Sequence, residues 1–134
     1  MLEHRRSEFT QDEIPLLGNA IGETISKREY TCYAAALMPD HVHLLVRPHR
    51  DHAEEMIQFF QEESKVRLIE HKLRPINHPV WGGPGWKVFQ NTPEQIAATI
   101  EYIRRNPLKI GWPEQVWGFV TPYEGWVPKG WKRG

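Results

Sequence analysis

Apolar residues recur at helical spacing in the first half of the chain and predict two amphipathic helices. The first runs from about Gln11 to Lys27, and Pro15 is tolerated because it lies near the helix start. The second begins after Asp51, which forms a predicted capping box with Glu54, and ends before the proline-containing stretch 75–79. The positions expected to face the core are Ile14, Leu17, Ile21 and Ile25 in the first helix, and Met56, Ile57, Phe59, Phe60, Val66, Ile69 and Leu73 in the second.

A third helix is predicted where Thr92 and Gln95 form a capping box around Pro93, a residue favoured in the first helical turn. We expect this helix to end at about Asn106, because Pro107 follows. Its apolar ridge consists of Ile96, Ile100 and Ile103. A polar stripe shares the neighbouring flank, at about 100° per residue, and consists of Gln95, Thr99, Tyr102 and Asn106.

Three stretches are predicted to be strands, at residues 30–37, 41–47 and 86–90. The first two are joined by the turn sequence Pro39-Asp40 and form an antiparallel hairpin. Because side chains alternate along a strand, His41 and His43 share one face, and the apolar residues that alternate with them share the other. Two imidazoles on one face of a rigid strand can bind one metal ion, although half-exposed histidines also occur on strands that bind none.

The chain has 134 residues, of which 40% are hydrophobic and 25% charged, and is expected to form a single domain over residues 1–134. No apolar run approaches the length of a membrane span, and the N-terminal residues lack a signal-peptide pattern. We therefore expect a cytoplasmic protein without a membrane partner. The single cysteine, Cys32, excludes an internal disulfide and a multi-cysteine zinc site, and is expected to be a small buried strand residue.

The 17 Lys and Arg residues balance 17 Asp and Glu residues, so the net charge gives no support for nucleic-acid binding. Residues 102–134 nevertheless carry six basic and two acidic residues. Solvated surface explains this modest basic patch about as well as phosphate contacts do. Of the six tryptophans, four lie in loop-like or boundary sequence, and we expect most of these to close the core rather than to stack on bases: Trp81, Trp86, Trp112 and Trp117.

Two sequence motifs together resemble those of a known family. Residues 38–46 read Met-Pro-Asp-His-Val-His-Leu-Leu-Val, and residues 102–107 read Tyr-Ile-Arg-Arg-Asn-Pro. In this order and near this separation, they resemble the motifs of the single-tyrosine HUH transposases, in particular the branch of REP-associated tyrosine transposases. The resemblance covers about residues 30–112 and leaves 113–134 as an irregular C-terminal wrap. It implies an α+β fold of the ferredoxin-like type, an antiparallel sheet packed against helices.

The resemblance also implies roles for individual residues. His41 and His43 match the paired metal ligands, and Tyr102 matches the catalytic nucleophile. Asn106, one helical turn beyond Tyr102, matches the position that completes the metal shell. Without the histidine motif, Tyr102 would be interpreted as a boundary aromatic residue and Asn106 as a C-terminal helix cap. The residues expected to contact DNA phosphates next to the nucleophile are Arg104, Arg105 and Lys109.

The activity implied by the resemblance is metal-assisted cutting and rejoining of DNA strands, as in transposition. A divalent cation, Mg²⁺ or Mn²⁺, polarises the scissile phosphate, and the tyrosine attacks it to give a 5′-phosphotyrosine and a free 3′-hydroxyl. The implied substrate is single-stranded DNA, often beside a hairpin, and the implied enzyme is a homodimer. The sequence leaves open whether each tyrosine serves its own histidines or those of its partner.

The chain departs from the family pattern near its start and around residues 81–86. Family members usually begin with a strand, central in the sheet beside the histidine strand, whereas only ten residues, most of them polar, precede the first predicted helix here. A degenerate or domesticated transposase that binds hairpin DNA without cutting it is therefore an alternative.

A histidine-triad nucleotide hydrolase is disfavoured because position 45, where its third histidine belongs, is leucine. A structural protein with an accidental His-X-His is the remaining alternative.

Overall fold

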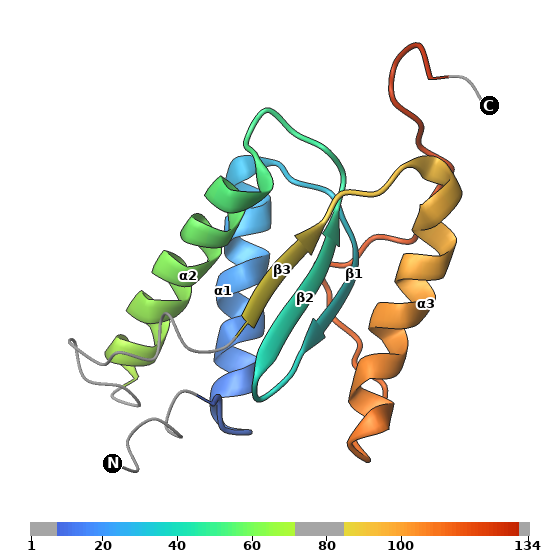
Figure 1. Ribbon diagram of the computed structural model, residues 1–134. Helices are drawn as coiled ribbons and strands as arrows, with labels where there is room; N and C mark the ends of the chain where they lie inside the picture. The colour runs from blue at the N-terminus through green and yellow to red at the C-terminus, as the bar shows by residue number, and fades with distance from the viewer. Residues whose placement is uncertain (1–7, 72–84, 132–134) are drawn as a thin grey trace.

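The structure of the protein is a computed structural model that describes residues 8–71 and 85–131 (Figure 1). In these ranges the chain forms α1 (Glu13–Arg28), β1 (Cys32–Leu37), β2 (His41–Val46), α2 (Ala53–Glu70), β3 (Gly85–Phe89) and α3 (Pro93–Lys109). The predicted helix break at 75–79, Leu73, Trp81 and the basic residues Lys132 and Arg133 lie outside the described residues. Among the described helices, none has the length and apolar content needed to cross a membrane.

The three strands form one mixed sheet in the order β1-β2-β3. β1 and β2 form the predicted antiparallel hairpin, whereas β2 and β3 run parallel. The α+β class is confirmed and is consistent with a ferredoxin-like fold, but the expectation of an antiparallel sheet was wrong for this second pair. The physical reason is the α2 crossover, which returns the chain to the starting end of β2, so that β3 runs in the same direction as β2.

Among the described residues, β3 is the strand that pairs with the histidine strand on the side away from β1. Its residue Gly85 pairs with His41, and Lys87 pairs with His43. Phe9 is buried, packs edge-on to Trp86, and donates its backbone N–H to the Pro39 carbonyl at 2.8 Å. The residues just before α1 therefore close the end of the sheet.

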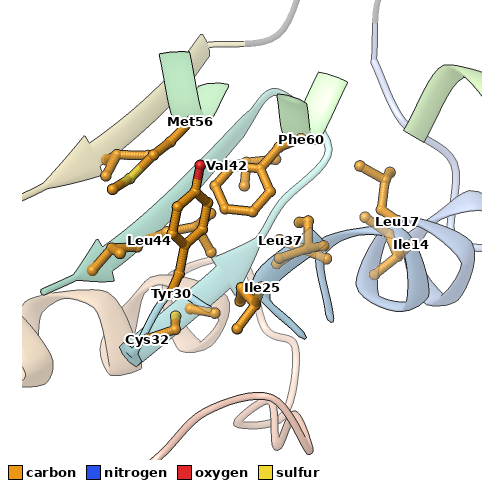
Figure 2. Close-up of a cluster of buried hydrophobic side chains, with 14 of the residues drawn as sticks. Ile14, Leu17, Ile25, Tyr30, Cys32, Leu37, Val42, Leu44, Met56 and Phe60 are labelled. Carbon is orange, nitrogen blue, oxygen red and sulfur yellow. The ribbon is translucent and has the colours of Figure 1, made fainter. Parts of the chain in front are cut away.

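Helices cover both faces of the sheet, with α1 and α2 on one side and α3 on the other (Figure 1). The predicted alternation along β2 is confirmed, because Val42, Leu44 and Val46 all belong to the core cluster on the α1 and α2 side. Figure 2 shows part of this cluster, in which Phe60 and Met56 from α2 lie over the strands. Leu45 belongs to a second cluster with Ile96 and Ile103 of α3. The two histidines share the face of Leu45 and thus face α3.

The start and the buried face of α2 differ from the prediction. The capping box is formed one residue later, by His52 and Glu55, with the His52 backbone N–H donating to Glu55 Oε1 at 2.7 Å. Asp51 instead accepts a hydrogen bond from the Tyr30 hydroxyl at 2.7 Å, which removes it from the cap. Val66 is 48% exposed, and the fully buried positions on α2 are Met56, Phe60, Ser64 and Leu68.

The predicted capping box of α3 is confirmed, with the Thr92 backbone N–H donating to Gln95 Oε1 at 3.2 Å. The predicted end at Asn106 was wrong, because the helix continues through Pro107 to Lys109. A proline in the last turn removes only one backbone hydrogen bond. Burial of Pro107 and of Ile103 against the sheet offsets this loss.

The C-terminal segment 112–131 crosses the outer edge of β1. The side-chain amide of Gln115 both accepts from the Leu37 N–H and donates to the Leu37 carbonyl, each at 2.9 Å. Further along, Thr121 donates its N–H to the Cys32 carbonyl at 2.8 Å. Trp86, Trp112 and Trp117 pack against the core as expected, and Cys32 is fully buried in its strand. This segment satisfies backbone groups that would otherwise form an exposed sheet edge.

Candidate functional site

The two histidines of β2 lie side by side beneath α3. Their ring centroids are 4.4 Å apart. The Nδ1 atom of His41 is 2.8 Å from the Asp40 carboxylate. A carboxylate that accepts from Nδ1 holds the proton there and leaves the lone pair on Nε2, on the side of the ring away from Asp40, which is the common arrangement of metal-binding histidines. Asp40 thus belongs to the site, although the sequence analysis assigned it only to a turn.

Two histidine nitrogens, His41 Nε2 and His43 Nδ1, are buried and have no hydrogen-bond partner among the described residues. Burial, together with the nearby charges of His41 and Lys87, lowers the pKa of His43 to about 4. His43 is therefore neutral near pH 7, the form that binds metals. In the described part of the chain, no group of three His, Cys, Asp or Glu side chains is arranged to hold a metal ion. The pair is chemically compatible with a divalent cation whose remaining ligands are oxygen atoms.

Tyr102 of α3 lies against the histidine pair. Its ring stacks on His43 with centroids 5.9 Å apart and planes inclined by 24°. Phe89 of β3 completes an aromatic trio, edge-on to His43 at 5.5 Å and to Tyr102 at 6.2 Å. Tyr102 remains 44% exposed. The phenol is thus held by ring contacts but is open to a ligand.

Asn106 lies one turn after Tyr102 and is 6% exposed. Its Nδ2 atom donates to the Tyr102 carbonyl at 3.3 Å, which fixes the amide and leaves Oδ1 directed away from that carbonyl. α3 runs opposite in direction to β2 (Figure 1), so Asn106 lies nearer than Tyr102 to the His41 end of the strand. A metal-ligating role for Asn106 stays a prediction.

The three basic residues expected near the nucleophile are not equivalent. Lys109 Nζ is 5.0 Å from the centroid of the Tyr102 ring. Arg104 and Arg105 instead form ion pairs with Glu101, with nearest distances of 2.5 Å and 2.8 Å. Lys87, which the sequence analysis did not single out, has its Nζ atom 5.0 Å from the Phe89 ring centroid. The two lysines, rather than the arginines, provide the positive charge beside His43 and Tyr102.

A cavity of about 780 Å³ opens beside the aromatic trio, between β3 and α3. The predicted polar stripe contributes Gln95, Thr99 and Tyr102 to its lining. Lys87, Phe89 and Asn91 line it from the β3 side and were missed. Alternation along the strand would have placed Lys87 and Phe89 on one face, but only the pairing of Lys87 with His43 shows that it is the histidine face.

Comparison with known proteins identifies the family of this chain. A family model described as "Transposase IS200 like" matches residues 1–106, and the chain belongs to this family. A curated protein from Haemophilus influenzae, named "Putative REP-associated tyrosine transposase", is 23% identical over 125 residues, which cover 87% of this chain and 71% of that protein. No solved structure matches. The resemblance drawn from the two motifs is thus confirmed at the level of the family.

Proposed function

We propose that this protein cuts and rejoins single-stranded DNA through a covalent bond between Tyr102 and a 5′-phosphate. The observation that carries the proposal is the stacking of an exposed tyrosine on His43, beside two buried imidazole nitrogens. These nitrogens, His43 Nδ1 and His41 Nε2, have no hydrogen-bond partner within residues 8–71 and 85–131. Membership in the IS200-like transposase family and the name of the Haemophilus influenzae relative support it. A tyrosine nucleophile also explains why this aromatic side chain is left open to solvent.

The proposed reaction is the transfer of a phosphoryl group from the 3′-oxygen of one nucleotide to the Tyr102 oxygen. The Tyr102 hydroxyl gives its proton to solvent, and its oxygen attacks the phosphorus atom of the scissile diester. The bond from phosphorus to the 3′-oxygen breaks, and that oxygen takes up a proton. The products are a 5′-phosphotyrosine and a free 3′-hydroxyl. Attack of another 3′-hydroxyl on the phosphotyrosine reverses the chemistry and joins a new pair of ends.

His41, His43 and the Oδ1 atom of Asn106 are the groups that would hold a divalent cation, Mg²⁺ or Mn²⁺. When bound, such a cation supplies charge that polarises the scissile phosphate. Asp40 orients His41, and the stacked His43 ring orients the phenol. Lys87 and Lys109 favour binding of the negatively charged backbone near the phenol. The expected substrate is single-stranded DNA beside a hairpin, and the expected working unit is a homodimer.

The test is formation of a covalent adduct. The purified protein is incubated with Mn²⁺ and a pool of labelled single-stranded hairpin oligonucleotides, and the products are separated on a denaturing gel. We expect a protein–DNA band that is lost in Tyr102→Phe and in His41→Ala. Matched controls are Tyr123→Phe and His71→Ala, which remove the same groups from the C-terminal segment and from the end of α2.

Two outcomes would contradict the proposal. An adduct that persists in Tyr102→Phe would exclude this residue as the nucleophile. Binding of hairpin DNA without any adduct from the unmodified protein would instead favour the alternative of a DNA-binding protein that does not cut.

A further inference from the structure

The cavity beside Tyr102 is larger than a cation and one phosphate group require. It is an open surface depression with a volume of about 780 Å³, enough room for a base laid against its wall. It lies on the side of Tyr102 that is lined by β3 and the first turns of α3, whereas Asn106 is not part of its lining. The cavity thus extends the site from Tyr102 towards the start of α3. A DNA strand bound at Tyr102 would continue in this direction.

Two polar side chains line this cavity, the partly buried Asn91 and the exposed Gln95, and each has a hydrogen-bonding group without a partner in the described part of the chain. The Oδ1 atom of Asn91 is buried and has no partner among the described residues. A buried carbonyl oxygen without a partner is costly and indicates a missing ligand or water. The Oε1 atom of Gln95 accepts from the backbone N–H and hydroxyl of Thr92, each at 3.2 Å. Because an amide carries its donors opposite its acceptor, the Gln95 Nε2 is left to donate elsewhere.

An aromatic surface and a positive charge lie next to these amides. Phe89 is half-buried and is held edge-on by His43 and Tyr102. Lys87 is exposed, with its Nζ atom 5.0 Å from the centroid of the Phe89 ring. Aromatic side chains stack on the bases of single-stranded DNA, and an exposed lysine beside them pairs with a backbone phosphate. Amide side chains read the donors and acceptors on a base edge.

We propose that this cavity binds one unpaired DNA base next to the scissile phosphate, and that Asn91 and Gln95 select that base by hydrogen bonds to its edge. Phe89 provides the stacking surface and Lys87 neutralises the adjoining phosphate. The inference rests on the proposed function for the position of the scissile phosphate. Its test, however, measures DNA binding and not DNA cleavage, so the base subsite and the proposed cleavage activity can fail separately.

The experiment measures base preference in the Tyr102→Phe protein, in which the proposed cleavage is blocked. Fluorescence anisotropy gives the affinity for labelled single-stranded oligonucleotides in which each position in turn carries each of the four bases. We expect one position at which the wrong base weakens binding by about tenfold or more. In the Asn91→Ala and Gln95→Glu variants this difference should fall to within about twofold. Gln95→Glu keeps the oxygen that caps α3, so loss of the helix cap does not explain its effect. It replaces the amide donor by a charged oxygen, which weakens binding of all four bases alike, so the readout is the ratio of affinities between bases and not the affinity itself.

The matched control is Asn19→Ala, an exposed asparagine on α1 at the opposite face of the sheet, which should keep the preference. Free deoxynucleoside monophosphates form a further arm. If they compete as strongly as the oligonucleotide, the cavity is a mononucleotide site and the proposal of a DNA subsite is overturned.

Two more results would overturn the inference. One is equal affinity for all bases at every position, and the other is a preference that survives both amide variants. If either accompanies a Tyr102-dependent adduct, the proposed function stands and only the subsite is lost. If the base preference disappears in both amide variants but the unmodified protein forms no covalent adduct, the subsite is supported and the proposed cleavage activity is contradicted.

Discussion

The phenol ring of Tyr102 lies over the imidazole of His43, with ring centroids 5.9 Å apart, although the two residues come from different elements of the fold. The contact exists because α3 covers the face of β2 that carries the histidines (Figure 1). Phe89 touches both rings from β3. The relative position of Tyr102 and the histidines is therefore set by packing of three elements and not by a flexible loop.

Asp40 should affect metal binding without being a ligand. Its carboxylate is 2.8 Å from His41 Nδ1 and holds that ring in the orientation that leaves Nε2 free. We expect Asp40→Asn to weaken Mn²⁺ binding by about 10- to 100-fold, measured by calorimetry. Asp12→Asn, at the exposed N-cap of α1, is the matched control and should leave binding unchanged. Equal affinity in Asp40→Asn would show that the carboxylate does not orient His41.

Lys109 and Arg105 should contribute differently to DNA binding. Lys109 lies beside Tyr102, whereas Arg105 is paired with Glu101. We expect Lys109→Ala to reduce the slope of log affinity against log salt for single-stranded DNA by about 0.7, the value for one phosphate contact. Arg105→Ala should reduce it less. Anisotropy titrations between about 50 and 200 mM salt measure both slopes. A larger effect for Arg105 would mean that DNA displaces Glu101 from its arginine partners.

The Glu101 ion pairs should make stability depend on pH in the acid range. Hydrogen bonds from Arg104 and then Arg105 lower the pKa of Glu101 from 4.5 to about 2. Because the folded-state pKa is the lower one, the stabilisation is complete above about pH 4.5 and is lost as the pH falls towards 2. We expect Glu101→Gln to lower the free energy of unfolding in urea at pH 7, and the difference from the unmodified protein to shrink below pH 4.5.

The matched control for this effect is Glu70→Gln, which removes one exposed charge at the end of α2. A Glu101→Gln difference that stays constant from pH 7 down to about pH 2 would show that the ion pairs contribute nothing to stability.

Gly18 should be intolerant of alanine. A Cβ atom at this position would overlap the ring of Trp117, which the C-terminal segment packs against α1. Overpacking costs about 1–3 kcal/mol, against a gain of about 1 kcal/mol in helix propensity. We expect Gly18→Ala to lower the free energy of unfolding. Gly118→Ala, with no atom within 4 Å of its added Cβ, should change it by less than about 0.5 kcal/mol. Equal effects in the two variants would mean that Trp117 moves freely.

Much of the fold could be predicted because it follows from local patterns. Capping chemistry located the start of α3, and alternation along β2 separated the histidine face from the core face. The start of α2 was misplaced because Asp51 is taken up by Tyr30, a partner from a distant part of the sequence. The direction of β3 and the end of α3 likewise depend on tertiary contacts, which no local pattern contains.

The candidate site was predicted only in part. The motifs identified His41, His43 and Tyr102, and the structure places all three together. The ion pairs of Arg104 and Arg105 with Glu101 were not predicted. Sequence spacing places these residues close together on α3 but does not determine the side-chain rotamers that bring their charges into contact. The β3 residues at the site depend on strand register, which the sequence of β3 does not fix.

The parallel pairing of β2 with β3 has a consequence for how the molecule folds. The β1-β2 hairpin closes a short loop, whereas pairing His41 with Gly85 closes a loop that includes all of α2. Contacts distant in sequence carry the larger loop-closure entropy and form late in the folding reaction. The histidine strand should therefore be in place early, and the β3 wall that carries Phe89 should be added near the end. A partly folded chain would therefore have its two imidazoles in register on the β1-β2 hairpin before Phe89 packs against them.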